Sequence, residues 1–143
     1  MSPVKIGHWG GTGGQPCDVN QTPSQLISVT VYCDTCAITA IEFTYEDSSG
    51  NRHDEGPWGS DGDGDDVIDL HSRYLKEISG TTGQVGSMSN IVTSLRFVTN
   101  KNKVYTFGKT SGTPFSVPIQ DGKIVGFFGR AGDYLDAIGI YCA

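Results

Sequence analysis

The stretch QLISVTVY, residues 25–32, alternates apolar and polar side chains from Ile27 to Tyr32. One face carries Ile27, Val29 and Val31, and the polar residues between them face the other way. A period of two residues is typical of a β-strand with one buried face. The stretch therefore predicts a half-buried strand.

The same alternation recurs along the chain, in TAIEFTYE at residues 39–46 and less regularly in NIVTSLRFVT and AIGIYC. Clusters of Gly, Asn, Asp, Ser and Pro separate these stretches and predict turns. Residues 65–79 also carry apolar residues at helical spacing. We nevertheless predict two strands there, around a turn at residues 71–73, because all surrounding segments read as β-structure. The predicted fold class is all-β.

The composition limits the function classes. With 143 residues, 36% hydrophobic and 18% charged, the chain fits one globular domain. A net charge of -6 and the lack of any Lys/Arg cluster argue against a nucleic-acid partner. No apolar run is long enough for membrane insertion. The first residues do not resemble a signal peptide, so we expect a cytoplasmic protein, small enough to reach the nucleus as well.

Neither metal chemistry nor catalysis has a matching motif. Cys33 and Cys36 form a C-x-x-C motif without a second pair for zinc, so free thiols are favoured over a disulfide. The pairing state of Cys17 and Cys142 stays open. The acidic segment DGDGDD, residues 61–66, lacks the Gly and Glu of an EF-hand and reads as a solvated loop. We therefore expect no metal, no cofactor and no enzyme activity.

Two series of short motifs suggest an internal repeat. Trp9-Gly10, Trp58-Gly59 and Phe107-Gly108 recur at equal intervals, and a second series comprises TAIEF, TSLRF and DAIGI. Three related units in a short β-chain predict a pseudo-threefold architecture. The third unit begins with Asp136, where the other two carry Thr39 and Thr93. If a ligand requires the carboxylate, only this corner of the three can bind it.

The stretch GRAGDYLDAIGIY, residues 129–141, combines closely spaced glycines with Asp136. Glycines let backbone N–H groups approach a ligand closely, and an ionised carboxylate accepts hydrogen bonds. The combination predicts a small pocket for a polyhydroxylated ligand. The alternative is that Asp136 only caps a turn.

Four segments together resemble the jacalin-related lectins, and most closely the mannose-specific single-domain lectins of grasses and other monocots. They are KIGHWGGTGG, EISGTTG, GTPFSVPI and GFFGRAGDYLDAIGIY. The resemblance covers essentially the whole chain, residues 1–143, as one lectin domain. It implies a β-prism I fold, in which three four-stranded Greek-key sheets surround a pseudo-threefold axis.

The resemblance also implies a sugar site between the first glycine-rich loop and a G-x-x-x-D loop, here residues 132–136. Asp136 would accept hydrogen bonds from the sugar hydroxyls O4 and O6, while backbone N–H groups donate to O3, O5 and O6. The Tyr134 ring would lie near the sugar, or else cover apolar surface. The residues implied to bind carbohydrate are Gly14, Asp133, Tyr134, Leu135 and Asp136.

The predicted function is reversible, metal-independent binding of mannose- or glucose-containing glycans and glycoproteins in a plant stress or defence setting. The segment TCAIT, residues 35–39, lacks the glycine and aspartate of a second site, so one site per chain is expected. The resemblance suggests a homodimer. A galactose-preferring lectin and a protein-interaction or aggregating module are the alternatives.

Overall fold

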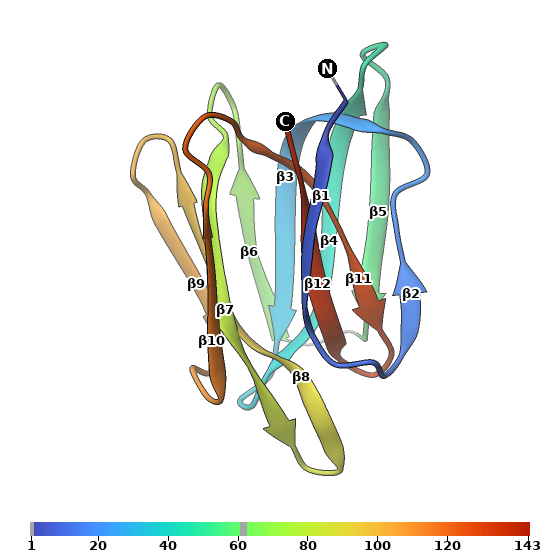
Figure 1. Cartoon of the computed structure of the whole chain (residues 1–143), viewed down its shortest axis with the longest axis vertical. Coiled ribbons are helices and arrows are strands. Elements are labelled where there is room, and N and C mark those ends of the chain that lie inside the picture. The colour runs from blue at the N-terminus through green and yellow to red at the C-terminus, as the bar shows by residue number, and fades with distance from the viewer. Residues whose placement is uncertain (1, 61–62) are drawn as a thin grey trace.

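The computed structural model describes residues 2–60 and 63–143, and for residues 63–66 only the backbone. Twelve strands and no helix occur in this part of the chain (Figure 1), so it contains no helix able to cross a membrane. The strands are β1 (Val4–Gly10), β2 (Gln15–Cys17), β3 (Pro23–Cys33), β4 (Ile38–Asp47), β5 (Arg52–Gly59), β6 (Asp63–Asp69), β7 (Leu75–Val85), β8 (Met88–Thr99), β9 (Val104–Gly108), β10 (Thr113–Pro118), β11 (Ile124–Ala131) and β12 (Leu135–Cys142). The all-β prediction is confirmed.

The strands pair antiparallel into two sheets. The smaller sheet has the order β5-β4-β3-β6, and the larger sheet has eight strands. Within the larger sheet, β1, β12, β11 and β2 form one group of four, and β9, β8, β7 and β10 form another. Ile124 and Leu75 form the one residue pair that joins β11 to β7 in the described chain. The prediction of three separate sheets was therefore wrong in this respect, because this pair merges two four-stranded groups.

Strand β3 shows where simple alternation fails. Val29 and Val31 are fully buried, as predicted. The register with β4 shifts between Leu26 and Ser28, so Ile27 is an extra residue in the ladder. A β-bulge of this kind moves the following residues to the opposite face. Leu26 consequently enters the core, whereas Ile27, predicted to lie on the buried face, is only half-buried.

The segment with competing helical and strand patterns forms two strands. Strand β6 ends at Asp69, a turn follows in which Ser72 has a φ of 58°, and β7 begins at Leu75. The backbone N–H of Arg73 donates to the Leu70 carbonyl at 3.1 Å. The prediction of strands around this turn is confirmed. The two strands do not form a hairpin, since β6 pairs with β3 and β7 pairs with β8.

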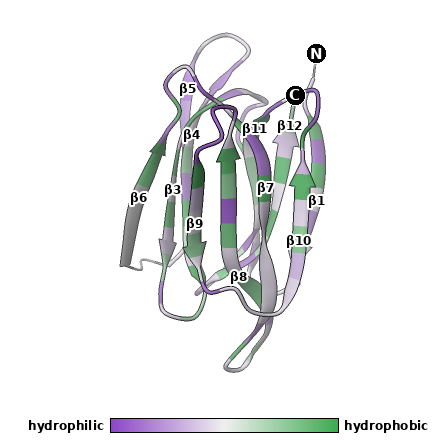
Figure 2. Cartoon of the chain, turned by 90° about the vertical axis from the view of Figure 1, so that its left-hand side faces the viewer, coloured by the Kyte–Doolittle hydropathy of each residue, from purple (hydrophilic) through white to green (hydrophobic). Residues whose placement is uncertain are grey.

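A single aromatic cluster joins the three groups of four strands. Phe43 of β4 packs edge-on against Phe127 of β11 at a ring-centroid distance of 5.1 Å, and Phe127 packs against Phe97 of β8 at 5.9 Å. All three rings are at most 2% exposed. Apolar and polar bands follow one another along β8 (Figure 2), and every residue from Ile91 to Thr99 except Arg96 is buried. The core therefore belongs to both sheets in common.

The repeated glycines take part in one recurring backbone contact. Gly10, Gly59 and Gly108 all have positive φ, and a Cβ on any of them would meet a carbonyl oxygen within 2.3 Å. The residue after each glycine donates its N–H to that same carbonyl. The donor–acceptor pairs are Gly11 with Asp136 at 2.9 Å, Ser60 with Thr39 at 3.0 Å and Lys109 with Thr93 at 2.9 Å. The three acceptor residues, Thr39, Thr93 and Asp136, are the first residues of the motifs TAIEF, TSLRF and DAIGI.

Candidate functional site

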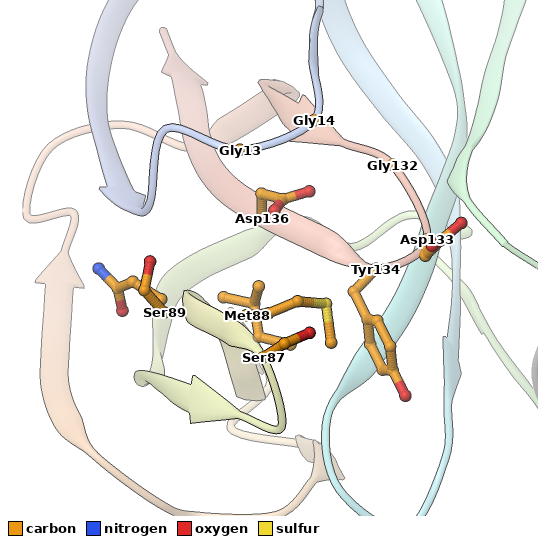
Figure 3. Close-up of a pocket in the computed structure, with 11 residues that line it drawn as sticks. Gly13, Gly14, Ser87, Met88, Ser89, Gly132, Asp133, Tyr134 and Asp136 are labelled. Atoms are coloured by element: carbon orange, nitrogen blue, oxygen red, sulfur yellow. The ribbon is translucent and has the colours of Figure 1, made fainter.

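The connections β3–β4, β7–β8 and β11–β12 lie at the end of the molecule opposite both chain termini (Figure 1). A pocket of about 350 Å³ opens here (Figure 3). It is formed by the β1–β2 loop, the β7–β8 hairpin and the β11–β12 loop. The lining residues are Gly13, Gly14, Ser87, Met88, Ser89, Asn90, Ile91, Gly132, Asp133, Tyr134 and Asp136.

Asp136, near the start of β12, lies beneath the β1–β2 loop and is 8% exposed. A Cβ on Gly13 would lie 2.7 Å from its Oδ2, and a Cβ on Gly14 would lie 2.6 Å from its Oδ1. Gly14 also has a φ of +68°, in the region that favours glycine. Glycine at both positions therefore lets the loop backbone approach the carboxylate directly.

The carboxylate of Asp136 is buried without being neutralised. Within the described chain, no group donates a hydrogen bond to its oxygens and no cation forms an ion pair with it. Burial raises its pKa, the Arg130 guanidinium opposes this shift, and the charge of Asp133 adds to it. Buried carboxylates are normally hydrogen-bonded or paired. This one keeps its acceptor capacity for a ligand in the pocket.

Arg130 of β11 holds the glycine loop above the carboxylate. Its Nε donates to the Gly13 carbonyl and its Nη2 to the Gly14 carbonyl, both at 3.0 Å. A guanidinium presents its donors in a rigid fork, so the two bonds fix the loop at consecutive residues. Since the loop carbonyls point to Arg130, the guanidinium stabilises the loop from outside the pocket.

The β11–β12 loop places the other residues predicted to bind a ligand. Asp133 is exposed, and the half-buried ring of Tyr134 lines the pocket on the side of Met88 (Figure 3). Leu135 is 1% exposed and belongs to the hydrophobic core, so its side chain does not line the pocket. The structure thus brings Gly14, Asp133, Tyr134 and Asp136 together at the pocket, whereas Leu135 links Tyr134 to Asp136 and points into the core.

Comparison with known proteins identifies the family of this all-β chain. The family model of the Jacalin-like lectin domain matches residues 6–141. The chain belongs to the jacalin-like lectin family.

Relatives of this jacalin-like lectin cover nearly its full length. Horcolin from Hordeum vulgare is 48% identical over 142 residues, which is 97% of this chain and 96% of Horcolin. AcmJRL, a mannose-binding jacalin-related lectin from Ananas comosus, superposes with a TM-score of 0.92 at 41% identity, covering 98% of this chain and 96% of AcmJRL. Artocarpin complexed with Me-α-mannose superposes with a TM-score of 0.89 at 31% identity, covering 100% of this chain and 99% of the artocarpin chain.

Sequence reasoning missed part of the lectin's pocket. The β7–β8 hairpin supplies residues 87–91 of the lining, and neither its composition nor its spacing marks it as functional. Gly13, which was not among the residues predicted to bind carbohydrate, lines the pocket beside Gly14. The role of Arg130 depends on contacts more than a hundred residues apart along the chain. No local pattern could have revealed it.

The described residues contain no candidate metal site. No three His, Cys, Asp or Glu side chains gather there as they would around a metal ion. All four cysteines are free, which agrees with the thiols predicted for Cys33 and Cys36. The acidic segment at 61–66 lies outside the described residues, except for the backbone of residues 63–66.

Proposed function

We propose that this lectin binds mannose- or glucose-type glycans reversibly, at one site per chain and without a metal. The observation that carries the proposal is Asp136, a buried carboxylate with free acceptors beside a pocket. A hexose presents several hydroxyl donors, which such a carboxylate can satisfy by charge-assisted hydrogen bonds. The mannose-binding AcmJRL and the artocarpin complex with Me-α-mannose support the choice of sugar.

In the proposed arrangement, the Asp136 carboxylate accepts hydrogen bonds from the sugar hydroxyls O4 and O6. The backbone N–H groups of Asp133, Tyr134 and Leu135 donate to O5 and O6, and that of Gly14 donates to O3. Backbone donors in a short loop lose little side-chain entropy on binding. For a small open pocket we expect millimolar affinity for a monosaccharide, about -4 kcal/mol.

We also propose that the three groups of four strands are copies of one unit around a pseudo-threefold axis, as in a β-prism I fold. The recurring glycine–carbonyl contact and the shared aromatic cluster support this. Thr39 and Thr93 take the place of Asp136 in the other two units and carry no charge. One sugar site per chain follows from this difference.

The family resemblance alone supports two further parts of the proposal, a homodimer and a role in plant stress or defence, and a cytoplasmic location stays a prediction. In a dimer, binding of a multivalent glycan to one site holds its other sugars close to the second site. This high local concentration would make the glycan bind more tightly than a single millimolar site allows. Light scattering coupled to size-exclusion chromatography would measure the assembly directly. A monomer in solution would remove this source of avidity.

Calorimetric titration with methyl α-mannoside and methyl α-galactoside in EDTA tests the function. We expect mannoside binding at one site per chain and much weaker galactoside binding. Stronger galactoside binding would keep the lectin but reverse its specificity. Binding of neither sugar would contradict the proposal and favour a protein-interaction module, and turnover of a chromogenic glycoside would indicate an enzyme.

A further inference from the structure

A side-chain contact joins the pocket wall to the other sheet. The hydroxyl of Tyr134 donates a hydrogen bond to Oδ2 of Asp34, which lies 100 residues earlier in the chain. Asp34 follows β3 and belongs to the β3–β4 turn of the four-stranded sheet, whereas Tyr134 precedes β12 of the larger sheet. The orientation of the Tyr134 ring therefore depends on a residue outside the pocket.

Asp34 is itself held rigidly by its own turn. Its Oδ1 accepts the backbone N–H groups of Cys36 at 2.7 Å and Ala37 at 2.8 Å, and its own N–H donates to the Ala37 carbonyl at 3.0 Å. Burial alone would raise the pKa of Asp34, but hydrogen bonds from Tyr134, Cys36 and Ala37 outweigh it and lower the pKa. One carboxylate oxygen thus fixes the turn, and the other is presented to Tyr134.

The same sheet holds the β11–β12 loop at a second point. Oγ of Ser60, directly after β5, donates to the carbonyl of Asp133 at 2.6 Å. Within the loop, the Gly132 N–H donates to the Tyr134 carbonyl at 2.9 Å. With Ser60 on the backbone and Asp34 on the ring, the four-stranded sheet fixes both the path of the loop and the direction of its aromatic side chain.

We propose that Asp34 is a positioning residue for sugar binding, which holds Tyr134 in place as a wall of the pocket before the sugar arrives. The inference rests on the proposed function, since it assumes that this pocket takes the sugar. Without Asp34 the ring would rotate freely and would have to be ordered during binding. Ordering one such side chain corresponds to about two- to tenfold in affinity.

Four proteins test the proposal by calorimetry with methyl α-mannoside: the wild type, Asp34→Ser, Tyr134→Phe and the double variant. A serine hydroxyl can accept the same backbone N–H groups but offers no second oxygen to Tyr134. Asp54→Ser is the matched control, because Asp54 accepts a hydrogen bond from Thr44 at 2.6 Å in the same sheet, outside the pocket. Thermal unfolding shows that each variant is folded at the titration temperature.

We expect Asp34→Ser and Tyr134→Phe each to weaken binding by about two- to tenfold, and the double variant to be no weaker than either single one. The control should bind like the wild type. The ¹³Cζ resonance of Tyr134 is identified as the one that is missing from the spectrum of Tyr134→Phe. In sugar-free Asp34→Ser we expect this resonance to shift. A general loss of stability would not cause that shift.

Wild-type affinity in Asp34→Ser, or additive losses in the double variant, would overturn the inference and leave the lectin function standing. Mannoside binding absent already in the wild type would overturn both. In that case the ¹³Cζ shift would still show whether Asp34 holds the ring. The two failures are therefore distinguishable.

Discussion

Replacing Asp136 by asparagine should abolish sugar binding and at the same time stabilise the sugar-free protein. Asparagine has nearly the same shape but no charge, so the glycine loop above it can keep its path. The carboxylate is buried, and burial raises its pKa. Folding therefore transfers the ionised group to a place that favours it less than water does.

The size of the binding loss follows from the proposed contacts. Two charge-assisted hydrogen bonds contribute about 1.5–3 kcal/mol each. The total binding free energy of a millimolar ligand is only about 4 kcal/mol in magnitude. Asparagine keeps one neutral acceptor oxygen but loses the charge and the other acceptor, so the remaining affinity should be too weak to measure. A folded-state pKa above the unfolded value contributes stability at low pH that is lost as the pH rises through the folded-state pKa. The advantage of Asp136→Asn in thermal midpoint should therefore be small near pH 4 and grow toward neutral pH.

Calorimetry and thermal unfolding between about pH 4 and pH 8 measure both effects. Asp133→Asn is the matched control, since it removes the same charge from an exposed side chain of the same loop. It should keep mannoside binding. The reasoning is refuted if Asp136→Asn binds mannoside within about threefold of the wild type, or if its thermal midpoint lies below the wild type at neutral pH.

Three further predictions concern the loop, the core and the thiols. Gly14→Ala places a Cβ 2.5 Å from the Ala131 carbonyl carbon at a positive φ, so it should cost about 1–3 kcal/mol of stability and abolish binding; an unchanged denaturation midpoint would contradict this. Phe97→Ala leaves a cavity at a fully buried site and should lower the free energy of unfolding, measured in urea, by about 3–5 kcal/mol. A loss below about 1 kcal/mol would show that the core collapses around the cavity. Cys36 is exposed and the other three cysteines are half-buried. A thiol reagent should therefore modify one cysteine in a fast phase, and Cys36→Ser should remove that phase. A fast phase that persists in the variant would mean that another thiol opens to solvent.

Much of the fold follows from the sequence because strand periodicity is local. Ile41, Phe43 and Tyr45 lie in the core as the alternation in β4 predicts. Ile27 does not, because a bulge depends on the partner strand and leaves no trace in the composition of β3. The merging of two strand groups at Ile124 and Leu75 is likewise a contact between distant segments. Periodicity does not specify such contacts.

The candidate site divides in the same way. Asp136 could be singled out because a carboxylate beside loop glycines and before an apolar strand has a direct chemical meaning, whereas Gly14 was indicated by the family resemblance. Asp34 and Arg130 could not, because each acts through hydrogen bonds to residues about a hundred or more positions away, which only the folded chain brings close. A lone carboxylate in a turn, or a lone arginine on a strand, has no distinctive pattern.

The pairing of β1 with β12 affects how the protein can be synthesised. Val4 lies opposite Cys142, and β12 sits between β1 and β11. β12 leaves the ribosome after every other described strand, so until then β1 lacks its partner and the pocket lacks Asp136. The proposed sugar site is therefore incomplete in the growing chain, whose unpaired strand edges need protection against aggregation. A nonsense codon before Leu135 would yield an aggregation-prone fragment that lacks the proposed sugar site.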